Sequence, residues 1–118
     1  MSTAYYAHEN PCPHCNKPEK RLHIGSKAGG WQFHFAAYFD EHLTDFTEWE
    51  TFLMRDEVVV VDEYDCAVDK AAFFALVANS ADGQSHYDWC SVKPEYPSYM
   101  SRIYKDQNGW TFSKDWFR

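Results

Sequence analysis

The sequence predicts an α+β fold, in which a small antiparallel sheet carries two helices and an N-terminal β-hairpin. Three observations predict it. Two cysteines separated by two residues precede a pair of strand-like segments, two segments with helical apolar spacing follow, and an Asn-Gly pair lies between two later apolar runs. A chain of 118 residues has the length of one domain. We expect residues 1–118 to form it, with a cysteine turn and hairpin at 11–38, a helix-strand-helix segment at 44–79 and a C-terminal hairpin at 101–118.

The N-terminal part of the chain reads as strands and a tight loop. We expect an edge strand around residues 5–6, and the three prolines in 11–18 indicate a loop. Residues 20–26 alternate between apolar and polar as a half-buried strand does. Ala-Gly-Gly at 28–30 supplies the backbone freedom of a hairpin turn, and the aromatic-rich segment 31–38 is the expected second strand.

Two helices are predicted by their caps as well as by their apolar faces. Asp45 or Thr44 can cap the first helix, and Glu48 can close a capping box. Asp69 can cap the second helix, which is expected to end near Asn79.

The remaining segments predict a strand, a loop and a hairpin. The four valines at 58–61 form a β-branched run that is typical of a strand buried on at least one face. Residues 80–100 are weakly patterned and contain two prolines, so we expect a loop there. Residues 101–105 and 110–113 flank Asp-Gln-Asn-Gly, which predicts a hairpin.

The cysteine turn is the strongest chemical signal. Cys12 and Cys15, on a turn that contains proline, form half of a structural zinc site. A hairpin turn centred on residues 28–29 would place His23 directly opposite His34, with their Cβ atoms about 4.5–5.5 Å apart. We therefore expect a structural Zn²⁺ in a closed Cys₂His₂ site of the zinc-ribbon kind.

A second arrangement of the same residues stays open. A CPxC turn, a hairpin and then a helix is also the order of elements in a treble-clef zinc finger, which takes its second ligand pair from the start of the helix. That region offers His42, with Asp40 or Asp45 beside it, and His8 is also near the turn. His42 and His8 are thus alternates for the fourth ligand. The plainer interpretation is that the thiols are free and the histidines lie at the surface.

The charge is concentrated in the middle of the chain. Residues 40–69 contain eleven acidic residues and one base, whereas residues 1–39 carry a net charge of +2. Such a segment repels nucleic acid and attracts basic surfaces. Asp62, Glu63 and Asp65 are the candidate partner-binding residues. A solvated surface and an ordinary charged turn are the alternatives.

Motifs of the common enzyme classes are absent from the sequence. It contains no Walker loop, no GxGxxG, no GxSxG and no HExxH, so we expect no catalytic residues and no enzymatic activity. A nucleic-acid-binding module is the alternative function, and a metal-dependent enzyme is a further one. The apolar runs are too short to span a membrane, and the N-terminus is unlike a signal peptide, so we expect a cytoplasmic protein. The bases available to a nucleic-acid surface are Lys17, Lys20, Arg21 and Lys27.

Several short motifs recur in the order of a known group of proteins. They resemble those of small, functionally uncharacterised proteins from tailed bacteriophages and prophages. The motifs are Tyr5-Tyr6, Cys12-x-x-Cys15, Leu22-His23-Ile24-Gly25, Gly30-Trp31-x-Phe33, Trp49, Asp62-Glu63-Tyr64 and Gly109-Trp110-x-Phe112-Ser113.

The resemblance implies a phage-encoded accessory protein that acts in the cytoplasm of an infected bacterium, with no established enzymatic activity. The resemblance supports Cys12, Cys15 and His23 as a set. The proteins of that group have a histidine nearer the position of Ala36 than that of His34, so the resemblance does not support His34 as the fourth ligand. We therefore expect a protein that binds, and inhibits, a host or defence-system protein. An acidic patch that mimics phosphate charge is the expected binding surface.

Overall fold

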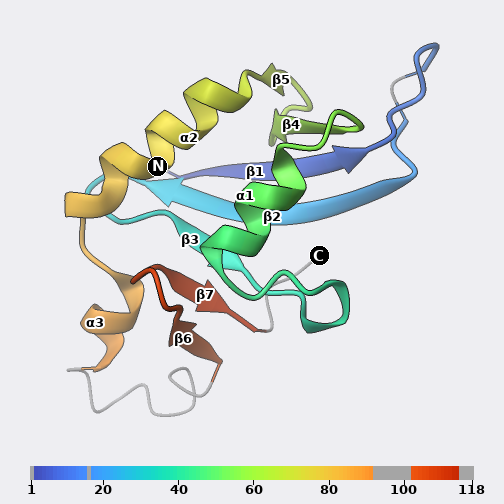
Figure 1. Ribbon diagram of the computed structural model, residues 1–118. Helices are drawn as coiled ribbons and strands as arrows, with labels where there is room; N and C mark the ends of the chain where they lie inside the picture. The colour runs from blue at the N-terminus through green and yellow to red at the C-terminus, as the bar shows by residue number, and fades with distance from the viewer. Residues whose placement is uncertain (1, 16, 92–101, 115–118) are drawn as a thin grey trace.

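The computed structural model describes residues 2–15, 17–91 and 102–114. These residues form an α+β fold around one seven-stranded sheet with the order β5-β4-β1-β2-β3-β7-β6 (Figure 1). Neighbouring strands are antiparallel, except that β3 and β7 are parallel. The predicted α+β class with a mostly antiparallel sheet is therefore confirmed, whereas the zinc-bound hairpin is not shown. The strands are β1 Ser2–Glu9, β2 Lys20–Ala28, β3 His34–Ala36, β4 Val58–Asp62, β5 Ala67–Val68, β6 Ile103–Lys105 and β7 Thr111–Ser113.

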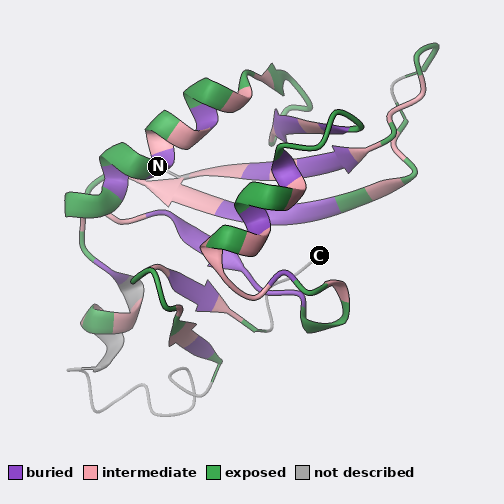
Figure 2. Ribbon diagram, in the orientation of Figure 1, coloured by how far each residue is buried: buried purple, intermediate pink, exposed green. Residues whose placement is uncertain are grey.

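The longer helices cover one face of the sheet (Figure 1). They are α1 Phe46–Leu53 and α2 Lys70–Asn79, and they are accompanied by α3 His86–Ser91 and the short 3₁₀ helices η1 Phe39–Glu41 and η2 Ser80–Asp82. The fully buried Trp49 and Phe73 bring α1 and α2 into the same apolar cluster as the inward side chains of the strands. The buried residues follow the inner strands and the sheet-facing sides of both helices (Figure 2). Within the described ranges, no helix is long and apolar enough to cross a membrane.

Both predicted helix caps are present. The carboxylate of Asp45 accepts a hydrogen bond from the Glu48 backbone N–H at 2.7 Å, and the Thr44 hydroxyl donates to the Glu48 carboxylate at 2.7 Å. Asp69 accepts from the Ala72 backbone N–H at 3.1 Å, and α2 ends at Asn79 as expected. These side chains satisfy N–H groups that a helix leaves without partners in its first turn.

Three elements differ from the prediction. β1 is longer than expected and lies inside the sheet, because β2 pairs with one of its edges and β4 with the other. β3 is much shorter than the predicted strand 31–38. The loop predicted for 80–100 is wrong at α3, where the Ser85 hydroxyl accepts from the Asp88 N–H at 3.3 Å. The rest of that prediction, from residue 92 onward, lies outside the described residues.

Candidate functional site

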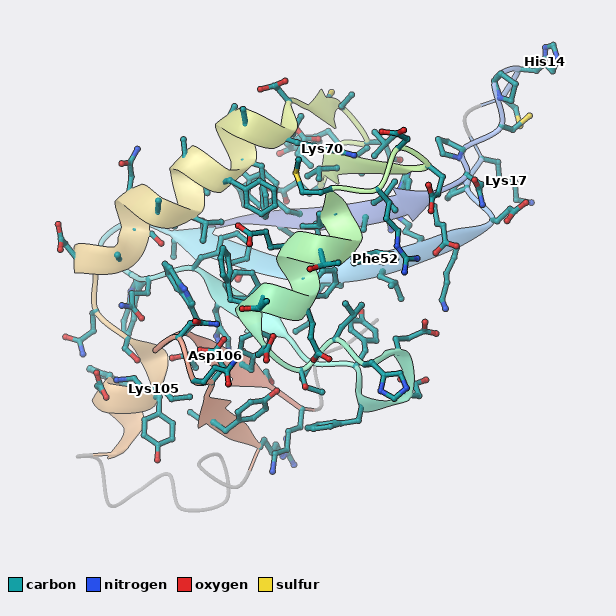
Figure 3. The ribbon with its side chains drawn as sticks, in the orientation of Figure 1. His14, Lys17, Phe52, Lys70, Lys105 and Asp106 are labelled. Carbon is teal, nitrogen blue, oxygen red and sulfur yellow. The ribbon has the colours of Figure 1, made fainter. Side chains whose placement is uncertain are left out.

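The cysteine turn lies at the far end of the β1–β2 hairpin. The backbone N–H of Cys12 donates to the carbonyl of Lys17 at 2.9 Å, which closes the turn. Cys12 is half-buried and Cys15 is exposed. Figure 3 shows His14 at the outermost point of this loop, away from the helices and the centre of the sheet.

The two thiols of this turn lie close together. Hydrogen bonding from the backbone N–H groups of Cys15 and His14, followed by the Cys15 side chain, lowers the pKa of the Cys12 thiol because it favours the thiolate. Both sulfurs also line one open depression together with Pro13 and Lys17. Two neighbouring thiols are the kind of ligand that a soft metal ion prefers, and metal binding by this turn stays a prediction.

The predicted histidine ligands lie elsewhere. His34 pairs with Ser26 in the β2–β3 ladder, so the predicted pairing of His34 with His23 is wrong. The physical reason is that residues 30–32 pair with another segment and not with β2. The Gln84 backbone N–H donates to the Gly30 carbonyl and its carbonyl accepts from the Gln32 N–H, both at 2.9 Å. This contact takes the chain away from β2 before β3 begins, and the register moves by three residues.

His23 and His42 do not join the thiols either. His23 is buried on β2, where its ring lies 5.1 Å from that of Tyr6, and burial is the main cause that lowers its pKa to about 4. The alternate His42 is exposed at the end of η1. In the part of the chain that the structure describes, no three His, Cys, Asp or Glu side chains form a group that could hold a metal ion. The expected four-ligand set is thus not assembled, and a zinc site remains a prediction.

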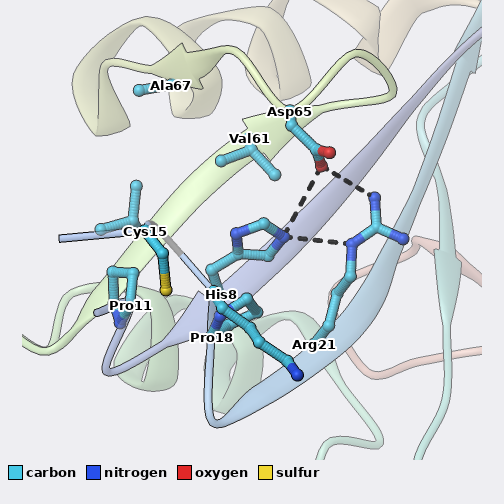
Figure 4. A pocket seen from close by; sticks show the side chains of 10 residues that line it. His8, Pro11, Cys15, Pro18, Arg21, Val61, Asp65 and Ala67 are labelled. Atoms are coloured by element: carbon cyan, nitrogen blue, oxygen red, sulfur yellow. Dashed lines mark hydrogen bonds and ion pairs between the residues drawn. The ribbon is translucent and has the colours of Figure 1, made fainter. Parts of the chain in front are cut away.

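The other alternate, His8, belongs to a pocket of about 700 Å³ beside the turn (Figure 4). Arg21 Nε donates to His8 Nε2 at 3.1 Å, and Arg21 Nη2 donates to Asp65 Oδ1, also at 3.1 Å. Since His8 Nε2 accepts this bond, the proton of the neutral ring is on Nδ1. Burial, followed by the charge of Arg21, lowers the pKa of His8. Cys15 and Lys17 also line the pocket.

Sequence reasoning missed this pocket as a unit. Its polar residues come from two strands and a turn that are distant in the sequence. The signal that could have found part of it is strand alternation, because His8 pairs directly with Arg21 across β1 and β2. The position of Asp65 depends on how the chain returns after β4, which local spacing does not predict.

The three predicted partner-binding carboxylates have different roles. Asp62 Oδ1 accepts from the backbone N–H groups of Tyr64 at 2.9 Å and Cys66 at 3.0 Å, so it shapes the turn between β4 and β5. Asp65 is held by Arg21, at a positive φ of 61°. Glu63 and Tyr64 are exposed, and 76% of the Tyr64 surface is accessible. We name residues 62–66 the acidic turn.

No protein-family model, curated protein or solved structure matches the chain. The described residues define a small α+β domain with three local features of chemical interest. They are the cysteine turn with its two thiols, which we also call the dithiol turn, the adjoining pocket in which Arg21 contacts His8 and Asp65, and the acidic turn.

Proposed function

We propose that this chain is a phage-encoded accessory protein that binds, and inhibits, a host or defence-system protein through its acidic turn. The observation that carries the proposal is the exposure of Glu63 and Tyr64 on a turn that Asp62 and Asp65 brace. Such a turn loses little conformational freedom when it binds. Tyrosine is among the residues that contribute most to binding energy at protein interfaces.

The charge of the segment 40–69 supports a basic partner. Asp45 and Asp69 cap helices. They still contribute to the negative potential of the segment, because a carboxylate that accepts backbone hydrogen bonds keeps its charge. Some charge is neutralised, because Glu41 pairs with Lys20 and Asp65 with Arg21. Glu50, Asp56, Glu57 and Glu63 are exposed. The remaining field would speed association with a basic groove, such as the nucleic-acid groove of a nuclease.

The same ion pairs make a nucleic-acid-binding function the less favoured alternative. Of the four bases that the sequence offered for it, Lys20 pairs with Glu41 and Arg21 pairs with Asp65. Lys17 remains exposed on the cysteine loop. A mobility shift at low salt that weakens steeply as salt rises would favour this alternative instead.

The experiment is affinity capture from bacterial lysate with a matched pair of double variants. Glu63→Gln with Tyr64→Ala removes one charge and one exposed ring from the acidic turn. Glu50→Gln with Phe39→Ala removes the same groups elsewhere, since both side chains are exposed. We expect the wild type and the control pair to retain one specific protein, and the acidic-turn pair to lose at least about tenfold in affinity, which is about 1.4 kcal/mol.

The identified partner should then be tested with purified components. A DNA duplex should compete for it if the acidic turn occupies a nucleic-acid groove, and salt should weaken the complex. Equal retention by both double variants would show that the acidic turn is not the binding surface. Failure to retain any specific protein would contradict the proposed function as a whole.

A further inference from the structure

The dithiol turn has the form of half a metal site. Its backbone is closed by the hydrogen bond from Cys12 to Lys17 and bordered by a second one, from Glu19 to Glu9 at 3.0 Å. Pro11, Pro13 and Pro18 restrict the backbone around it. The backbone on either side of the thiols is therefore restricted.

The two sulfurs are also accessible from outside the molecule. Cys15 is exposed, and both sulfurs line an open depression rather than an enclosed cavity. The loop projects beyond the ends of β1 and β2, with His14 at its tip (Figures 1 and 3). A large partner can reach this position without disturbing the core.

A structural Zn²⁺ needs four ligands, and this turn supplies two thiolates. Among the described residues, no third His, Cys, Asp or Glu joins them in a group. The same turn of a second copy would supply the two missing thiolates. In such a dimer a two-fold rotation relates the copies, so the same surface lies on both sides of the contact. We propose that one Zn²⁺ joins two copies of this chain through Cys12 and Cys15 of each copy.

A Zn²⁺ with four thiolates carries a net charge of −2. Lys17 lines the depression together with the two cysteines and can offset part of this charge, and Glu19, which also lines it, accepts a hydrogen bond from the Asn10 side chain at 3.1 Å. Two copies bring two such lysines to the metal. Residues 1–39, which include the turn, carry a net charge of +2. This proposal does not require the acidic turn to bind a partner, although Asp65 and Cys15 line the same pocket.

The experiment measures zinc content and molar mass of the full chain, after loading with Zn²⁺ alone and after removal of the metal with a chelator. We expect half an equivalent of zinc per chain, a doubled mass with zinc, and the single-chain mass after chelation. Cys12→Ser and Cys15→Ser should each abolish zinc binding and dimer formation. Cys66→Ser is the matched control, because Cys66 is another exposed thiol and should leave both unchanged.

A further variant separates this site from a closed site within one chain. His23→Gln should leave the zinc content unchanged, because His23 is buried in the sheet. Zinc at one equivalent per single chain, with or without loss in His23→Gln, would overturn the proposal. A dimer that persists in Cys12→Ser, or a chain that binds no zinc while its thiols are reduced, would overturn it as well.

Discussion

Replacing Gly25 with alanine tests the central junction of the sheet. Gly25 pairs with Phe35 where β2 meets β3, and this ladder contains one further pair, Ser26 with His34. A Cβ atom on residue 25 would lie 2.1 Å from the carbonyl oxygen of His34 and 2.6 Å from the Phe33 ring. The first obstacle is backbone, so it cannot turn aside as a flexible side chain can.

The size of the effect follows from these distances. Real Cβ atoms essentially never approach closer than 3.0 Å, so the strands would have to separate by about 0.9 Å. Ladder hydrogen bonds of about 2.9 Å would then be stretched beyond the range in which they are effective. Overpacking in a core costs about 1–3 kcal/mol, occasionally more. We expect Gly25→Ala to lose about 3 kcal/mol or more of unfolding free energy.

The matched control is Gly29→Ala, since a Cβ atom there meets nothing within 4 Å. This variant should be neutral or more stable by up to about 1 kcal/mol, because alanine restricts the unfolded chain. The assay is urea unfolding followed by far-ultraviolet circular dichroism on both variants and the wild type. A loss below about 1 kcal/mol in Gly25→Ala, or equal losses in both variants, would refute the reasoning.

Two further predictions concern a buried base and a helix cap. Burial lowers the pKa of His23 to about 4, so the unfolded chain binds a proton at a higher pH than the folded chain. Stability should therefore fall as the pH drops from about 6.5 toward 4, by about 3 kcal/mol in all. His23→Gln should show a smaller fall in urea unfolding over this range, and an unchanged pH dependence would contradict the assignment. Asp69→Ala should lose about 1 kcal/mol because the Ala72 N–H loses its acceptor. Asp69→Asn should keep most of that stability, and equal losses would show that the cap contributes little.

Local signals predicted α1 and α2 well, whereas α3 was missed. The capping box at Thr44, Asp45 and Glu48 depends on neighbours in the sequence, and the structure confirms it. The cap at Asp69 is equally local. The Asn-Gly hairpin is confirmed too, with Gly109 at a positive φ of 87° that suits glycine.

Long-range contacts limited the rest of the prediction. The β2–β3 register depends on hydrogen bonds between Gly30, Gln32 and Gln84, which no local pattern reveals. An error in register moves every side chain of a strand to a new neighbour. The expected histidine pair was lost in this way. The pairing of Cys12 with Cys15 depended only on a short turn, and the two sulfurs are indeed close.

The parallel pairing of β3 with β7 has a consequence for how the chain folds. It joins residues 34–36 to residues 111–113, which are distant in the sequence, whereas β1 and β2 meet across a short loop. Contacts between distant residues must pay loop-closure entropy before they gain any energy, and folds rich in them are slower to form. We therefore expect the sheet from β5 to β2 to assemble early. The strands β3, β7 and β6 would add to this sheet last, once β7 has been synthesised and has left the ribosome.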